Sequence, residues 1–242
     1  MPAINQYSKS VLLFVFAFCM ILSPSILHAA KTPKPPKFVN ASPKLEPTPD
    51  CDILRLMKEK LGKPPKLDTK DLTAIKKGKV VVHKVGKFTE AGQLFEAFGT
   101  VDASPKELMA FMRDYPSRVG IMPHLEDATA KWEGNLAVVD LTIKVALTRL
   151  RYRLNVLHYG DYFMEWEYVH GDIKNTEGTY RFFPLSKGTR TLVVYRETSD
   201  PGIALPKFIL NLLTKNSIPD VIKAMRKGMA QKKQDLQTKA SE

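Results

Sequence analysis

The chain has 242 residues, of which 44% are hydrophobic and 26% are charged, a composition ordinary for a soluble fold. The first quarter has a non-globular composition, so about 165 residues remain for a core, which favours one domain over two. The 37 Lys and Arg exceed the 25 Asp and Glu by 12, which predicts attraction to anionic surfaces without identifying one.

Residues 1–30 have the layout of a secretory signal peptide. Lys9 precedes an apolar core from Val11 to Leu22, and small residues lie at the end of the segment, before Lys31. A retained membrane anchor is the alternative, but this core has about 12 residues and a spanning helix needs about 20. We therefore expect an exported protein, periplasmic or secreted, with cleavage near Ala30.

Cysteine usage adds one constraint. Lipoprotein processing at Cys19 is not expected, because Phe18 precedes it where such signals carry a small residue. Cleavage near Ala30 would leave Cys51 as the one thiol, so no internal disulfide is expected and the fold depends on its core.

Residues 31–77 are predicted to form a Pro- and Lys-rich linker, in which residues 31 to about 49 have the composition of a flexible spacer. Within it, apolar residues at helical spacing predict a short helix from Asp50 to Leu61, ended by Gly62 and Pro64. Docking of this helix on the main domain and docking on a partner both remain open.

The main domain is predicted over residues 78–236, followed by a disordered tail at 237–242. Strands are expected around Val80 to Val82 and from Leu94 to Val101.

A short helix through Arg113 comes next. Ser104, Pro105 and Glu107 are placed to cap its first turn, and Leu108, Phe111 and Met112 form one apolar stripe. The segment from Tyr115 to Leu125 is expected to return irregularly to the sheet.

Three later segments alternate apolar and polar residues, which predicts strands with one covered face. The apolar positions are Ala137, Val139, Leu141, Ile143, Val145 and Leu147, then Leu150, Tyr152, Leu154 and Val156, then Tyr162, Met164, Trp166 and Tyr168. A three-residue loop from Tyr159 to Asp161 would pair Leu154 with Trp166 and Arg153 with Glu167, which makes both faces chemically uniform.

Turns at Gly171-Asp172 and Lys187-Gly188 then predict an antiparallel meander. The last predicted element is an amphipathic helix from about Leu205, with a break between Asn216 and Pro219. Its far side carries basic residues, of which Lys223, Arg226 and Lys227 are candidates for contact with an anionic membrane surface. A solvated helix face is the alternative.

The segments GTYRFFP, GTRTLVVYRE and DPGIALP follow one another between Gly178 and Pro206. In these segments and in its order of elements, the chain resembles the START-related superfamily of lipid-binding and polyketide-cyclase-like proteins, including the coenzyme Q-binding group. The resemblance covers roughly residues 78–235. It implies an α+β helix-grip fold, in which a curved antiparallel sheet wraps around a long C-terminal helix and encloses a hydrophobic cavity.

A regular aromatic face is either a solid core or the lining of a pocket, and the resemblance favours a pocket. The expected cavity residues are Phe111, Met122, Leu141, Ile143, Tyr152, Leu154, Met164, Trp166, Tyr180, Phe182, Phe208, Leu212 and Met225.

Catalytic motifs are weak. Glu165 and Glu167 share a strand face, but predicted arginine neighbours make a charge ladder the better interpretation. The histidines are scattered, so no metal site or other cofactor is predicted, and no nucleophile motif is present. One face of this strand carries Arg149, Arg151 and Arg153, and Tyr152 lies on its other face. No aromatic side chain is therefore interleaved with these arginines for base stacking, and nucleic-acid binding is not expected.

We therefore expect a monomeric, exported carrier of a hydrophobic small molecule such as a lipid, a sterol-like compound or an isoprenoid quinone. One alternative is a cyclase or aromatase-like enzyme, which requires an ionisable side chain in the cavity, where the predicted faces supply only Tyr. The other is an interaction module with a solid core and no cavity.

Overall fold

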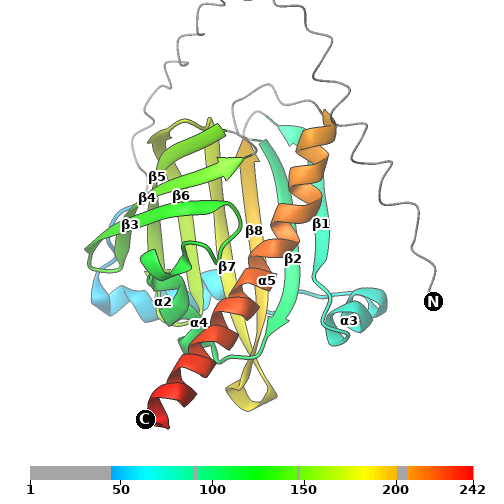
Figure 1. The fold of residues 1–242 in the computed structure, drawn as a ribbon, viewed down its shortest axis with the longest axis vertical. Helices are drawn as coiled ribbons and strands as arrows, with labels where there is room; N and C mark the ends of the chain where they lie inside the picture. Colours follow the sequence, from blue (N-terminus) through cyan, green and yellow to red (C-terminus); the bar gives the residue numbers. More distant parts are fainter. Residues whose placement is uncertain (1–44, 90–91, 146–147, 201–206, 242) are drawn as a thin grey trace, which may run out of the picture. The chain divides into compact units, whose positions relative to one another are not determined.

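The computed structural model describes residues 45–89, 92–145, 148–200 and 207–241 (Figure 1). The signal peptide expected at 1–30 and the first part of the expected linker lie outside these residues. The helices and strands are α2 (Asp50–Leu61), α3 (Thr69–Lys76), β1 (Val81–Thr89), β2 (Gly92–Val101), α4 (Pro105–Arg113), β3 (Leu125–Glu133), β4 (Leu136–Val145), β5 (Thr148–Tyr159), β6 (Phe163–Gly171), β7 (Asn175–Leu185), β8 (Arg190–Asp200) and α5 (Lys207–Ala240). Short 3-10 turns lie at Pro116–Arg118 (η3) and Ser186–Gly188 (η4).

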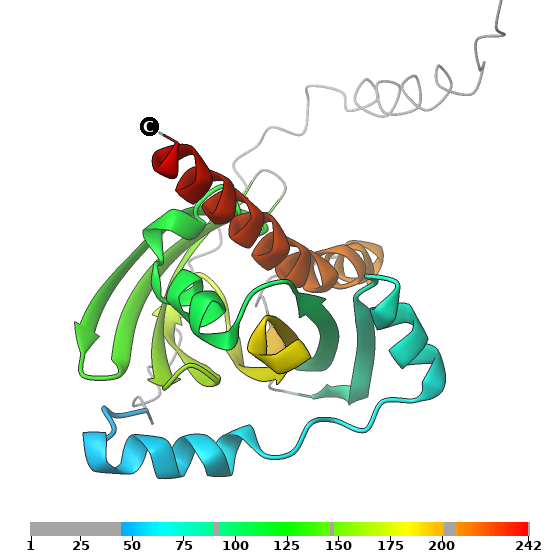
Figure 2. The same cartoon turned by 90° about the horizontal axis from the view of Figure 1, so that it is seen from below.

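The eight described strands form one antiparallel sheet in the order β1-β2-β8-β7-β6-β5-β4-β3. Pairing of β2 with β8 joins the start of the domain to its last strand, and the remaining strands follow as a meander. The sheet curves around α5, which crosses its concave side (Figures 1 and 2). This arrangement confirms the predicted α+β helix-grip fold.

The start of α4 shows the expected capping box. The Ser104 hydroxyl accepts a hydrogen bond from the Glu107 amide at 3.2 Å, and the Glu107 carboxylate accepts one from the Ser104 amide at 2.8 Å. Phe111 on the buried side of α4 packs against Gly228 of α5, where a Cβ atom would lie 2.6 Å from the ring. A glycine at this position therefore lets the two helices approach each other closely.

The β5–β6 hairpin has the predicted faces but a different pairing. Its three-residue loop comprises residues 160–162, so Trp166 pairs with Val156 and Glu167 with Asn155. The predicted pairing of Leu154 with Trp166 is thus wrong by two residues. A shift by two keeps every side chain on its own face, so Leu154 and Trp166 still share the inner face.

Three further elements differ from the sequence predictions. The strand β3 and the helix α3 were not predicted. The predicted break near Pro219 is wrong, because α5 continues through this residue, and Figure 2 shows its axis bending along its length. The helix also runs to Ala240, so residues 237–240 of the expected disordered tail are helical.

The convex face of the sheet is covered in two places by the segment that precedes β1. Met57 of α2 packs with residues of β4, β5 and β6 that include Leu157 and Phe163. Ile75 of α3 packs with Phe98, Phe183 and Val194. From residue 45 onward, the expected linker is therefore a packed part of the domain, and α2 docks on the domain.

Within the described residues, no helix combines the length and the apolar character needed to cross a membrane.

Candidate ligand-binding site

A cavity of about 160 Å³ lies on the concave side of the sheet, bordered by β3 to β8, by α5 and by the segment after α4. Eight of the residues expected from the sequence line it: Met122, Leu141, Ile143, Tyr152, Leu154, Met164, Trp166 and Tyr180. Phe111, Phe182 and Met225 are instead buried in the adjoining core. Phe208 and Leu212 belong to α5, but their side chains lie outside the described part of the chain. The inner face is therefore partly pocket and partly solid core.

Stacked aromatic rings form one wall of the cavity. Tyr180 on β7 is the direct cross-strand partner of Tyr195 on β8, and their ring centroids lie 4.7 Å apart with planes 11° from parallel. The Trp166 indole on β6 joins this stack, at 5.2 Å from Tyr180 and 5.9 Å from Tyr195. Such pairs add roughly 0.5–1.5 kcal/mol beyond area burial, so the wall is held in a fixed shape.

A chain of hydrogen bonds connects this wall to an acidic residue that also lines the cavity. The Trp166 indole donates to the Thr176 hydroxyl at 3.4 Å, and that hydroxyl donates to the Glu197 carboxylate at 3.2 Å. The Tyr195 hydroxyl donates to the other carboxylate oxygen. Burial raises the pKa of Glu197, while the hydrogen bonds from Tyr195 and Thr176 oppose that rise. The cavity thus contains a carboxyl group that gains a proton more readily than one in water.

A buried arginine lies in another part of the lining. The guanidinium of Arg118, at the end of η3, stacks on the Tyr115 ring with 4.2 Å between its central carbon and the ring centroid. Its side chain is buried, and its Nε atom has no hydrogen-bond partner. Burial lowers the pKa of Arg118, yet an arginine keeps its charge in a protein.

The sequence reasoning missed these polar residues. Tyr195 and Glu197 alternate with Arg196 on β8, and that alternation, had it been followed through this strand, would have placed both on the inner face. Arg118 lies in an irregular turn, where no periodicity indicates the direction of a side chain. The prediction that only Tyr supplies ionisable groups to the cavity is therefore wrong.

Tyr115 links the cavity to a buried histidine. Its hydroxyl lies 3.0 Å from Nε2 of His158, whose Nδ1 lies 3.4 Å from the Met109 sulfur. Because a thioether sulfur only accepts, Nδ1 carries the proton and Nε2 accepts from the phenol. Burial lowers the pKa of His158 to about 3, so this imidazole is neutral at physiological pH.

The paired carboxylates singled out in the sequence have a structural role on the convex face. Glu165 accepts hydrogen bonds from Lys60 at 2.6 Å and from the Tyr159 hydroxyl at 2.9 Å. Glu167 accepts one from the Leu45 amide at 2.7 Å. These contacts fasten the N-terminal segment to the sheet.

The arginines expected beside these carboxylates pair elsewhere. Arg153 forms two hydrogen bonds with Asp140, and Arg149 binds Glu126. The predicted ladder of Arg and Glu between β5 and β6 is therefore wrong.

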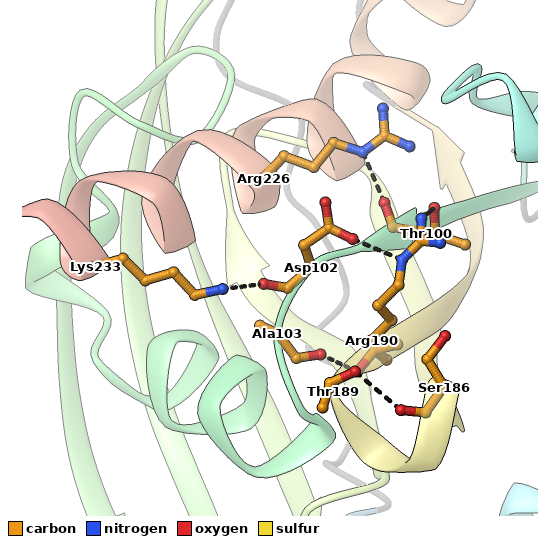
Figure 3. A network of polar contacts seen from close by, with 9 residues as sticks. Thr100, Asp102, Ala103, Ser186, Thr189, Arg190, Arg226 and Lys233 are labelled. Atoms are coloured by element: carbon orange, nitrogen blue, oxygen red, sulfur yellow. Dashed lines mark hydrogen bonds and ion pairs between the residues drawn. The ribbon is translucent and has the colours of Figure 1, made fainter.

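The basic face of α5 is only partly free for a membrane. Arg226 turns toward the sheet, where it donates to the Thr100 carbonyl at 2.7 Å (Figure 3). It also donates to the Gly78 carbonyl at 2.7 Å. Lys223 forms an ion pair with Asp220, and Lys227 is exposed. The expected contact of Arg226 with a membrane surface is not compatible with these bonds, because the side chain is occupied in holding the helix.

Figure 3 shows that this junction extends to the turns at the same end of the sheet. Arg190 binds Asp102 at 2.6 Å and the Thr100 hydroxyl at 3.1 Å, and Lys233 donates to the Asp102 carbonyl at 2.6 Å. These contacts tie α5 to the turn between β2 and α4. The C-terminal half of α5 is thereby fixed at the end of the sheet that these turns form.

Comparison with known proteins agrees with this geometry. The family model described as "Polyketide cyclase / dehydrase and lipid transport" matches residues 101–226, more than half of the chain. A comparison with curated protein sequences gave no match.

Several solved structures share the fold. A STAR-related lipid transfer protein from Xanthomonas axonopodis has a TM-score of 0.53 and 14% identity, over 61% of this chain and 92% of that one. A START superfamily protein from Mycobacterium smegmatis has a TM-score of 0.51 and 15% identity, over 57% and 97%. TTHA0849 from Thermus thermophilus has a TM-score of 0.50 and 16% identity, over 55% and 94%. At these identities the likeness is one of fold.

Proposed function

Because the chain belongs to the polyketide cyclase / dehydrase and lipid transport family of the START-related superfamily, we propose that it binds a hydrophobic small molecule between the sheet and α5 and carries it. The observation that supports this most directly is the cavity with its aromatic and aliphatic lining. The alternative of an interaction module predicts a solid core without such a cavity.

The size of the cavity implies that it opens to take up its ligand. Pockets for drug-sized molecules measure about 300–1,000 Å³, whereas this cavity of about 160 Å³ would hold a molecule close to benzene in size. The segment after η3 is a suitable entrance to the cavity, because Met122 and Pro123 line the cavity and are half-exposed. Their movement, or that of α5, would admit the ligand, and burial at about 25 cal/mol per Å² would hold it.

The proposed carrier would load and unload at a membrane surface after export. The signal-like layout of residues 1–30 supports export. The exposed cations of Lys223 and Lys227 on α5 support contact with anionic lipid head groups, each at roughly 1 kcal/mol near the surface.

A cavity-filling substitution tests the binding function. Leu141→Trp places a large side chain on the inner face, whereas Thr142→Trp places the same side chain on the outer face of the same strand. We expect ligands extracted from the wild type and from Thr142→Trp to be detected by mass spectrometry, and those from Leu141→Trp to be depleted about tenfold or more.

The same proteins are then mixed with a panel of lipids and quinones in anionic vesicles. Recovery of no ligand from the wild type, together with no binding across this panel, would refute the carrier. Equal loading of the two variants would place the ligand outside the cavity.

Glu197 favours one second candidate, an enzyme of the cyclase kind. Its carboxyl group lines the cavity with a raised pKa, which suits a general acid or base. An enzyme predicts that the ligand recovered from Glu197→Gln differs from that recovered from the wild type because the reaction stops at its substrate: its mass differs by one water for each dehydration, and its chromatographic retention differs where the cyclisation is an isomerisation. Identical masses together with identical retention would leave binding as the function.

A further inference from the structure

We propose, resting on the proposed function, that the ligand is an apolar molecule with an acidic head group of the carboxylate type, and that Arg118 holds this group. The cavity then has two parts: the apolar and aromatic side chains take the hydrocarbon, and the guanidinium takes the charge.

Arg118 is a buried cation whose hydrogen-bond donors are not all used. Its exposed fraction is 7%, it lines the cavity, and its Nε donor has no partner. Other arginines of the described chain use this atom: Nε of Arg153 binds Asp140, and Nε of Arg226 binds the Thr100 carbonyl. A buried donor left without an acceptor is costly, so its presence beside a cavity points to an acceptor on the ligand.

No described carboxylate forms an ion pair with Arg118, and the more distant charge of Asp114 only partly offsets the effect of burial on its pKa. The carboxylate of the cavity, Glu197, is engaged by Tyr195 and Thr176. The cation–π contact with Tyr115 stabilises a cation by about 0.5–2 kcal/mol, less than the several kcal/mol lost when an ion is taken out of water. A ligand anion would supply the missing charge.

The surroundings of Arg118 suit a carboxylate. Tyr152 and Tyr180 line the same cavity as Arg118, so two further phenol groups belong to its lining, whereas the Tyr115 hydroxyl is engaged by His158. The fork of an arginine matches the two oxygens of a carboxylate, and charge-assisted hydrogen bonds of this kind are the strong ones. The raised pKa of Glu197 also reduces its repulsion of an incoming anion.

The test compares three probes with one chain length and different heads: dodecanoate, dodecanol and dodecyltrimethylammonium. Binding to the full chain is measured by calorimetry below the micelle concentration, for the wild type and for Arg118→Met. Lys106→Met is the matched control, because it removes one exposed cation of α4 from the same +12 protein. Repetition in about 0.5 M NaCl separates a buried contact from attraction to the surface charge.

We expect the wild type and Lys106→Met to prefer dodecanoate over dodecanol by on the order of 10- to 100-fold, also at high salt. Arg118→Met should bind the two probes within about threefold of each other. Without ligand, its melting temperature should exceed that of the wild type, because a lone buried charge has been removed. If Arg118→Met does not fold, Arg118→Lys carries the test, since it keeps the charge but loses the fork and should lose part of the preference.

Other results would contradict either the acidic head group or the binding function. Equal binding of dodecanoate and dodecanol by the wild type, or a preference that survives in Arg118→Met, refutes the acidic head group while the binding function stands. Tightest binding of the ammonium probe refutes it as well and points to Glu197. Failure of all three probes to bind refutes the acidic head group alone if the extraction and vesicle experiments still recover a ligand, whereas failure in those experiments as well removes the proposed function.

Discussion

His158 couples protonation to folding at the scale of a single residue. Its imidazole is 1% exposed and is held between Tyr115 and Met109. The unfolded chain has a histidine pKa near 6.5, and burial lowers the pKa to about 3 in the folded state. Between these values the unfolded state holds a proton that the folded state lacks, so stability falls as the pH is lowered through this window.

His158→Gln should remove this acid sensitivity, because glutamine binds no proton and still offers an acceptor to the Tyr115 hydroxyl. Between about pH 6.5 and about pH 4, the wild type should lose about 3 kcal/mol of unfolding free energy relative to the variant. Urea unfolding of both proteins at several pH values measures this difference. Parallel stability curves would show that His158 is protonated in the folded protein.

Some of the cavity residues could be predicted from the alternation of apolar and polar residues, and others could not. Leu141, Ile143, Tyr152 and Leu154 were predictable because alternation along a strand fixes the face on which a side chain lies. Alternation does not determine whether the space in front of that face is filled. Phe182 follows the same pattern as the cavity residues but is buried in the core. Arg118 was not predictable, because its direction depends on the path of the turn after α4 and on the stacking with Tyr115.

At the scale of elements, the contact between β6 and β7 depends on one glycine. Trp166 pairs with Gly178, and a Cβ atom on Gly178 would lie 2.3 Å from the indole and 2.3 Å from the Arg196 carbonyl oxygen. The paired register between these strands ends at this pair. The indole therefore lies across the backbone of β7, where only a residue without a side chain leaves room.

Gly178→Ala should push the Trp166 indole away and break its hydrogen bond to Thr176. We expect a loss of about 1–3 kcal/mol of unfolding free energy and a changed Trp fluorescence spectrum. Glu177→Ala is the control, because the neighbouring Glu177 side chain is exposed and its removal should change stability by no more than about 0.5 kcal/mol. Equal effects of the two substitutions would mean that the indole has space elsewhere.

The order of the elements was predictable, but the pairing of individual residues was not. Alternation predicted the faces of β5 and β6, and a pattern of period two is satisfied equally well by registers that differ by two residues. The structure selects the register through the loop at residues 160–162 and through a register shift between the pairs Leu154–Tyr168 and Arg153–His170, where β6 has one extra residue. The path of α5 through Pro219 depended likewise on tertiary packing, since Ile218 and Ile222 on either side of the proline are buried in the core.

At the scale of the whole molecule, the sheet is covered on both faces. α5 and α4 cover the concave side, and α2 and α3 lie against the convex side (Figure 2). Backbone amides of the N-terminal segment also bind the sheet, from Leu45 to Glu167 and from Thr48 to the Asn135 side chain at 2.8 Å. Composition alone predicted a linker here because Pro and Lys dominate the segment, and the apolar residues that anchor it are few and widely spaced.

Met57→Ala tests whether this N-terminal segment belongs to the folding unit. Met57 is buried under α2 against Leu136, Leu157 and Phe163, whereas Leu54 on the same helix is 64% exposed. We expect Met57→Ala to lose about 1–3 kcal/mol of unfolding free energy in a single transition, and Leu54→Ala to stay within about 0.5 kcal/mol of the wild type. Urea unfolding followed by circular dichroism measures both. If Met57→Ala were as stable as Leu54→Ala, or if α2 melted in a transition of its own, the segment would be a docked appendage and the sheet would fold without it.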